Sequence, residues 1–260
     1  MLVKNEDIYI ERVIRNIMDF CDRIIITDHQ SVDLTFEICG RLANEFPKIE
    51  LRSIQFPQES ALAIEPYAGT NTWVFGVDGD EIYNSQGLKI MRKYLLEGAF
   101  SEEWCIFGNV LNVKSLDLNR KTARGYLAPP SRPMTKLYNF SMIESWANCP
   151  ERLHGDDIKF KNGFSSDLRR YLHTEIPWDQ SYFQCLHMPF MKRSSLDKAG
   201  IVKTRLIPEE VLRTSLQKNG VWRLLRVIKL KISQLIGLDW KNQKYGRGPL
   251  VEKDVSVFFT

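Results

Sequence analysis

Two aspartates separated by one glycine are the residues of this sequence best suited to hold a divalent metal ion. They lie in the run 78–81 (DGDE), which follows the apolar stretch 73–77 (WVFGV). Because side chains on a strand alternate with a period of two, we expect the carboxylates of Asp78 and Asp80 to project in nearly the same direction. Carboxylate oxygens suit Mg²⁺ and Mn²⁺, and such an ion neutralises charge that develops on a diphosphate leaving group. Alone, so short a run is as typical of a solvated acidic turn.

The elements before and after this run alternate between apolar β-branched stretches and amphipathic helical patterns. The sequence predicts strands at 23–27, 49–54, 73–77 and 104–113, and helices at 8–20, 34–46 and 86–97. Such alternation is typical of an α/β fold with a mostly parallel sheet, whose ligands bind beyond the carboxyl ends of the strands. The acidic residues after Thr27 and after Val77 both fall at such ends. Between 115 and 170 the pattern weakens, and the proline-rich piece 124–134 is typical of a loop.

Three elements in register resemble the family 2 glycosyltransferases. The opening Val3-Lys4-Asn5-Glu6 resembles the VKNE start of many members. Residues 27–35 (TDHQSVDLT) resemble their DNGSTDGT element, and residues 77–81 (VDGDE) resemble their LDADE element. The resemblance covers residues 1–114 and is thin afterwards.

The resemblance implies a GT-A fold, a nucleotide-diphosphate sugar donor, inversion at the anomeric carbon, and Mn²⁺ or Mg²⁺ as the cofactor. It implies nucleotide contacts from Val3, Asn5, Glu6, Asp28 and Asp78, the last near the ribose, and a metal ligand in Asp80, with Asp78 beside it. Two departures stand out: few residues precede VKNE, and the segment 62–66 (LAIEP) stands where many members have an Arg-Asn pair, a little before the strand that leads into the acidic run.

Inverting transfer needs one general base that takes the proton of the acceptor hydroxyl. Glu151 is the first candidate, because residues 146–151 (WANCPE) resemble a W…HE element of related enzymes, with proline in place of histidine. Asp156 and Asp157 are its alternatives. For each of them, a surface acid in a loop is an equally good interpretation.

His187 is the histidine best placed to complete a metal shell, because many GT-A enzymes carry one late in the domain. Neutral imidazole suits Mn²⁺, although a histidine packed in an apolar loop explains the same residue. His154 and His173 are less well placed. Lys192 and Arg193 follow and could meet the diphosphate, or be solvated loop charges.

The C-terminal quarter is strongly basic. Residues 201–248 hold eleven Lys/Arg against three acidic residues. Within them, the apolar residues of 221–236 recur at helical spacing, which predicts an amphipathic helix with one apolar face and cations on the opposite face. We expect it to lie on an anionic membrane surface, to pack on the domain or to form a homodimer. Nucleic acid is not expected as a partner, because no recognition pattern accompanies the charge. The predicted division is therefore a catalytic domain at 1–200 (donor half 1–114, acceptor half 115–200) and a basic appendage at 201–260.

Composition limits the class of protein and the compartment that we expect. Hydrophobic residues make up 43% of the 260, enough for a sizeable core. The five cysteines form no CxxC pair, which favours a reducing compartment over a disulfide framework or a zinc knuckle. No signal peptide and no apolar stretch long enough to span a bilayer is visible, so we expect a cytoplasmic protein, or one peripheral on the inner face of a membrane.

The sequence predicts transfer of a sugar to a hydroxyl on a glycan or lipid-linked saccharide, as in cell-surface polysaccharide synthesis. Three alternatives stay open. A degenerate GT-A module could bind a membrane or partner without catalysis. A phosphatase of the haloacid dehalogenase type also places Asp-x-Asp after a strand, but near the N-terminus and followed by Gly-Thr, whereas Glu81-Ile82 follows here. A nucleotidyltransferase normally shows a Gly-rich basic N-terminal loop, which this sequence lacks.

Overall fold

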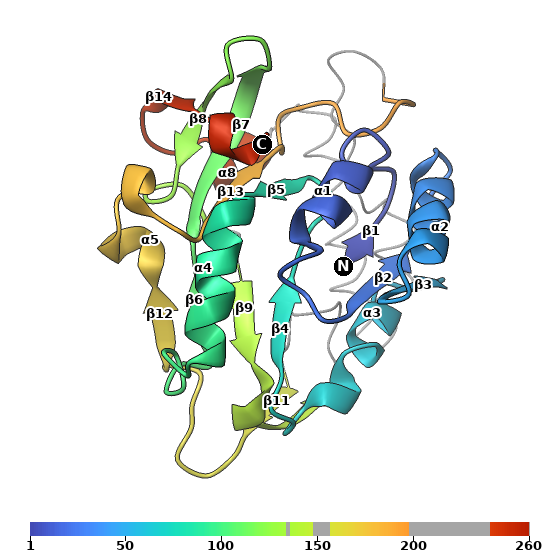
Figure 1. Cartoon of the computed structure of the whole chain (residues 1–260), viewed down its shortest axis with the longest axis vertical. Helices are drawn as coiled ribbons and strands as arrows, with labels where there is room; N and C mark the ends of the chain where they lie inside the picture. Colours follow the sequence, from blue (N-terminus) through green and yellow to red (C-terminus); the bar gives the residue numbers. More distant parts are fainter. Residues whose placement is uncertain (134–135, 148–156, 198–239, 260) are drawn as a thin grey trace, which may run out of the picture.

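The computed structural model describes residues 1–133, 136–147, 157–197 and 240–259, and its architecture is α/β, as the sequence predicts (Figure 1). The N-terminal half alternates strands and helices. Its elements are β1 (Leu2–Val3), α1 (Ile10–Ile17), β2 (Ile24–Asp28), α2 (Thr35–Glu45), β3 (Ile49–Ser53), α3 (Glu59–Leu62), β4 (Trp73–Gly76), β5 (Glu81–Tyr83) and α4 (Ser85–Leu96). Strands β1, β2 and β3 pair in parallel in the order β1-β2-β3.

Two mixed sheets are built from the later strands together with β4 and β5. Their other strands are β6 (Cys105–Phe107), β7 (Asn109–Asp117), β8 (Thr122–Leu127), β9 (Lys136–Asn139), β12 (Arg169–Tyr171), β13 (Gln184–His187) and β14 (Leu250–Asp254), and the helices of this part of the chain are α5 (Leu172–Glu175) and α8 (Trp240–Tyr245). One sheet has the order β12-β6-β9-β4 and the other β14-β8-β7-β13-β5. Strands β10 (Ile143–Ala147) and β11 (Asp157–Phe160) form a separate antiparallel pair. Parallel and antiparallel neighbours therefore mix outside the first three strands.

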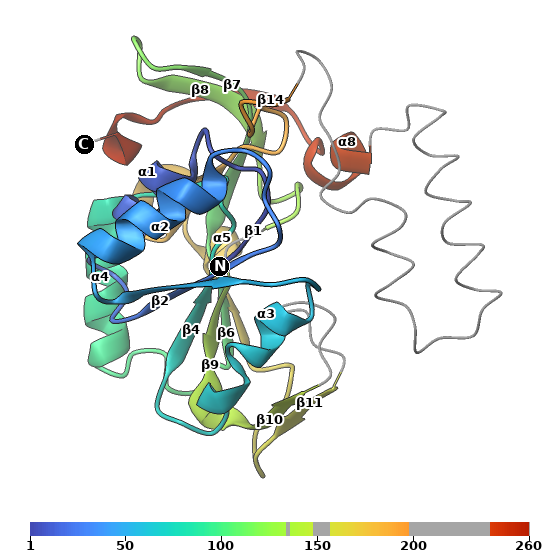
Figure 2. The ribbon, with the colours of Figure 1, turned by 90° about the vertical axis from the view of Figure 1, so that its right-hand side faces the viewer.

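Helices α1, α2 and α4 cover one side of the sheets, and α3 lies on the opposite side (Figure 2). The four apolar positions of α1 at helical spacing are all buried: Ile10, Val13, Ile14 and Ile17. They join a core cluster that runs from β2 through β7 and β13. Within the described part of the chain, no helix is both long and apolar enough to cross a bilayer.

The structure corrects two expectations about strands. The stretch 104–113 was predicted as one strand, but it forms two, β6 and β7, which belong to different sheets. The chain changes sheet at Gly108, where a Cβ atom would stand 2.4 Å from the carbonyl oxygen of Phe183. The second correction concerns 115–170, where the hydrophobic pattern is weak but strands β8 to β12 form. Of these, β8 pairs with β14 near the C-terminus.

Candidate functional site

The acidic run is a turn and not the end of a strand. Strand β4 ends at Gly76, β5 begins at Glu81, and the Glu81 N–H donates to the carbonyl of Asp78 at 3.2 Å. The prediction that strand alternation aligns Asp78 and Asp80 is therefore wrong. Both aspartates are buried.

Strand β1 brings the other two motifs to this turn. Val3 pairs with Asp28 at the carboxyl ends of β1 and β2, and Leu2 forms a parallel bridge with Asp78. The end of β1 is thus flanked by Asp28 on one side and by Asp78 on the other. Asp28 ends β2, as predicted, whereas Asp78 follows the end of β4 in a turn; the bridge from Leu2 still brings both acidic residues to the same edge.

The loop after β1 is tied to the loop after β2 by side chain to backbone hydrogen bonds. Asn5 has a φ of 53°, its N–H donates to Ser31 Oγ at 3.0 Å, and its Oδ1 accepts from the N–H of Val32 at 2.8 Å. Asp28 Oδ2 accepts from the Ser31 N–H at 3.0 Å, and its buried Oδ1 makes no hydrogen bond with the described residues. The Val3 side chain is fully buried in the core.

A cluster of charged side chains closes the site. Arg193 Nη1 lies 3.2 Å from Asp80 Oδ2 and 3.3 Å from Glu6 Oε1. His187 Nε2 lies 3.8 Å from the same Asp80 oxygen. Glu6, Asp80 and His187 are at most 4% exposed. Buried carboxylates are stable only when they are paired with cations or bound to metal, and Arg193 supplies one such charge.

Strand pairing explains why His187 faces this cluster. It is the last residue of β13, in register with Glu81 of β5 and with Asn112 of β7. After it, the Met188 N–H donates to the carbonyl of Asp80 at 3.0 Å, which joins β13 to the acidic turn. The pairing of β13 with β5 therefore holds His187 beside the acidic turn, although the two are far apart in the sequence.

Glu81 supports the turn from within. Its Oε2 accepts from the Asp78 N–H at 3.0 Å and from the Tyr83 hydroxyl at 2.8 Å. Burial, and then the charge of Asp78, raises the pKa of Glu81 to about 8. Burial and the neighbouring Asp80 likewise raise the pKa of Tyr9. The edge is thus a region where negative charge is disfavoured unless a cation is present.

The spacing of Asp80 and His187 fits a shared divalent ion. Two ligands at about 2.1 Å from one ion are separated by roughly 3.0 Å at a right angle and 4.2 Å when opposite, and the observed 3.8 Å lies between these limits. Across the described ranges, no three His, Cys, Asp or Glu side chains form a complete metal cluster. A small number of protein ligands, completed by phosphate oxygens of a substrate, is the usual arrangement for Mg²⁺.

The remaining predicted residues are less informative. Glu151, Asp156 and the helix predicted at 221–236 lie outside the described residues, as does His154, and of Asp157 only its place at the start of β11 is described. His173 lies in α5, buried, with its pKa lowered by burial. The exposed Lys192 donates to the Ser195 carbonyl.

Sequence reasoning missed Asn112, although a signal was present. Asparagine inside the apolar stretch 109–113 (NVLNV) is unusual, because a buried amide must be hydrogen-bonded. Its Oδ1 lies 2.8 Å from His187 Nδ1. The ion pair of Arg193 with Glu6 was also missed, since the two residues are 187 positions apart.

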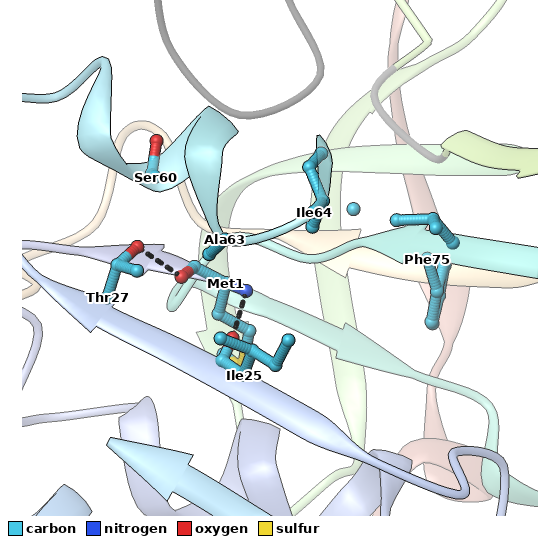
Figure 3. Close-up of a pocket in the computed structure, with 9 residues that line it drawn as sticks. Met1, Ile25, Thr27, Ser60, Ala63, Ile64 and Phe75 are labelled. Atoms are coloured by element: carbon cyan, nitrogen blue, oxygen red, sulfur yellow. Dashed lines mark hydrogen bonds between the residues drawn. The ribbon is translucent and has the colours of Figure 1, made fainter. Parts of the chain in front are cut away.

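A small pocket lies between β2 and β4 on the side of α3 (Figure 3). Its lining includes Met1, Thr27, Ser60 and Phe75, and none of the acidic residues of the cluster. The Met1 ammonium donates to the Ile25 carbonyl at 2.6 Å, and Thr27 Oγ1 donates to the Met1 carbonyl at 2.9 Å. These bonds tie the N-terminal residue to β2 beside the pocket.

Comparison with known proteins gives one curated relative and a loose structural likeness. No family model matches the chain. It is 22% identical over 184 residues to an uncharacterized glycosyltransferase of Rickettsia conorii (strain ATCC VR-613 / Malish 7), an alignment that covers 70% of this chain and 61% of that protein. The chain therefore spans less than two thirds of the length of this relative. S. aureus TarS 1–349 and its complex with UDP are 12% and 13% identical, with TM-scores of 0.43 and 0.42; each comparison covers 82% of this chain and 61% of that one.

Proposed function

We propose that this protein is an inverting, metal-dependent glycosyltransferase of the GT-A type, which moves a sugar from a nucleotide-diphosphate donor to a hydroxyl acceptor. The observation that carries the proposal is the meeting of three motifs at one sheet edge: β1 pairs with β2 at Asp28 and bridges to Asp78. The curated relative, named as a glycosyltransferase, supports the same class.

Asp80 and His187 would hold the Mn²⁺ or Mg²⁺ ion, with Asp78 beside them. When bound, such an ion neutralises the charge of the diphosphate leaving group. Arg193 contributes a fixed positive charge at the same oxygen of Asp80, 3.2 Å away, and would contact the diphosphate. These residues therefore stabilise the leaving group by charge alone, without a covalent step.

The nucleotide would lie on the loops after β1 and β2. Asp28 offers a buried carboxylate oxygen that has no hydrogen bond among the residues placed by the structure, which suits a donor on a base or ribose. Asn5 and Glu6 shape the loop beside it, Asn5 through Ser31 and Glu6 through its N–H, which donates to Thr35 Oγ1 at 2.7 Å. We assign Val3 a supporting role through its strand, since its side chain is buried.

The acceptor half of the reaction needs a carboxylate that takes the proton of the attacking hydroxyl. Glu151 is the proposed base, with Asp156 and Asp157 as alternatives. The acceptor would be a glycan or a lipid-linked saccharide.

Calorimetry with Mn²⁺ and UDP, GDP or dTDP tests the donor site, and a nucleotide-sugar hydrolysis screen identifies the sugar. Asp80→Asn and His187→Gln should weaken binding of Mn²⁺ with the nucleotide, whereas Asp19→Asn serves as a matched control because Asp19 is an exposed acid on the same domain. Nucleotide binding that needs no divalent ion and is unchanged in Asp80→Asn would refute the metal role.

The basic segment 221–236 is proposed to bind an anionic membrane surface. Sedimentation with vesicles of anionic and of neutral lipid, at low and high salt, tests this. Binding only to anionic vesicles, and lost in salt, is the expected result. An equal distribution in both preparations would leave packing or dimerisation as its role.

A further inference from the structure

A chain of buried hydrogen bonds leads from the main chain of α8 to His187. Ser131 Oγ lies 2.7 Å from the Tyr245 carbonyl, Asn112 Nδ2 lies 2.9 Å from Ser131 Oγ, and Asn112 Oδ1 lies 2.8 Å from His187 Nδ1. Asn112 and Ser131 are 0% and 2% exposed, and His187 is 4% exposed. The groups are therefore oriented by one another and not by bulk water.

The direction of each bond follows from the chemistry of its ends. A carbonyl oxygen only accepts, so the Ser131 hydroxyl spends its single proton on Tyr245. Its oxygen must then accept from Asn112, which places the amide nitrogen on that side; the same nitrogen also lies 3.4 Å from the Tyr126 carbonyl. The amide oxygen is left facing His187.

This orientation decides where a neutral His187 carries its proton. Because Asn112 presents an oxygen, Nδ1 must be the protonated nitrogen, and it donates to Asn112 Oδ1 at 2.8 Å. Nε2 then carries a lone pair, and it faces Asp80 Oδ2 at 3.8 Å. A lone pair opposite a carboxylate is repulsive unless a cation lies between them, which suits a metal-ligating imidazole.

We propose that Asn112 and Ser131 are positioning residues that hold His187 in the Nδ1-protonated tautomer, which makes Nε2 the ring nitrogen that would bind a divalent ion. Binding of a divalent ion at Nε2 rests on the proposed function, whereas the tautomer does not. The role of Asn112 is to fix ring orientation and proton position through the nitrogen that does not meet the ion.

Nitrogen-15 NMR of histidine-labelled protein, at a pH where the imidazole is neutral, tests the tautomer without metal or donor. His187→Gln assigns the signals. A pyrrole-type Nδ1 and a pyridine-type Nε2 are expected in the wild type. Asn112→Asp keeps an acceptor at this position and should retain the pattern, whereas Asn112→Leu and Ser131→Ala should lose it partly or wholly. A protonated Nε2 in the wild type, or a pattern unchanged in Asn112→Leu, would overturn the proposal.

Mn²⁺ titrated in the presence of UDP, followed by the electron paramagnetic resonance of the free ion, tests the consequence. Asn112→Leu should bind Mn²⁺ about 10- to 100-fold more weakly, and Asn112→Asp should recover most of the affinity. A residue with a merely structural role would lower thermal stability in both variants and leave tautomer and affinity unchanged. Absence of Mn²⁺ binding in the wild type would count against the proposed function, while the NMR result would still decide the tautomer.

Discussion

Gly79 allows the Glu6 carboxylate to approach the acidic turn, and replacing it with alanine should disturb that contact specifically. A Cβ atom at position 79 would stand 2.2 Å from Glu6 Oε2 and 3.2 Å from Ile10 Cδ1. The backbone at Gly79 does not have a positive φ, so the variant meets a steric clash and no conformational strain. Because Glu6 is fully buried and bonded to Arg193, its side chain cannot move without losing that ion pair.

Overpacking of this kind costs about 1–3 kcal/mol, and we expect Gly79→Ala to lower the free energy of unfolding by that amount. Urea denaturation measures it. In a Glu6→Ala background the obstructing side chain is absent, so the same substitution should cost much less, and the double-mutant cycle should give a coupling free energy of about 1–2 kcal/mol.

Gly40→Ala is the matched control. Gly40 lies inside α2, where an added Cβ meets only Leu51 Cδ2 at 3.9 Å. Alanine should therefore stabilise the helix by about 0.5–1 kcal/mol. If Gly79→Ala were as stable as the wild type, or equally destabilising with and without the Glu6 side chain, the close approach deduced for this turn would be wrong.

Three further outcomes are expected. Arg193→Gln leaves the two carboxylates that it bridges without this cation and should lower stability by roughly 3 kcal/mol, and Mn²⁺ should raise the melting temperature more in this variant than in the wild type. Asn16→Leu removes a side chain that pairs with both the carbonyl and the N–H of Tyr83, at a cost of about 2–4 kcal/mol by urea denaturation. Asn84→Ala removes the N-cap of α4, whose side chain accepts from the Gly87 N–H, and should cost about 1 kcal/mol in the same assay.

The parts of the fold that the sequence predicted best are those with local signals. Helix α1 was visible because its four apolar residues repeat at helical spacing, and all four are buried. The position of Asp28 at the end of β2 was predictable, since this acidic residue directly follows an apolar β-branched stretch. The turn at 78–80 was not predictable, because a strand that continues past Val77 and a turn that begins there have the same hydrophobic pattern.

The site as a whole could not be derived from local pattern, because its contacts join distant segments. Arg193 and Glu6 meet although 187 positions separate them, and His187 reaches Asn112 only through the pairing of β13 with β7. The strand order β14-β8-β7-β13-β5 is not the order of the sequence, so no spacing rule brings these residues together. The resemblance of residues 1–114 implied Asp80 as a metal ligand, and the histidine that many GT-A enzymes carry late in the domain suggested His187, but only the fold supplies Asn112.

On the proposed function, the arrangement around Asp80 links metal binding to the loop that carries Arg193. One carboxylate oxygen faces both Arg193 Nη1, at 3.2 Å, and His187 Nε2, at 3.8 Å, so an ion bound there competes with the guanidinium. The Arg193 loop is itself fastened to the loop after β1, since the Ile8 N–H donates to the Arg193 carbonyl at 3.1 Å. Coupling between two equilibria is reciprocal. An ion that weakens the contact between Arg193 and Asp80 is therefore bound more weakly, by the same factor, while that contact is present. Arg193→Gln should therefore bind Mn²⁺ more tightly in the absence of nucleotide, while losing the part of nucleotide affinity that the guanidinium supplies through the diphosphate.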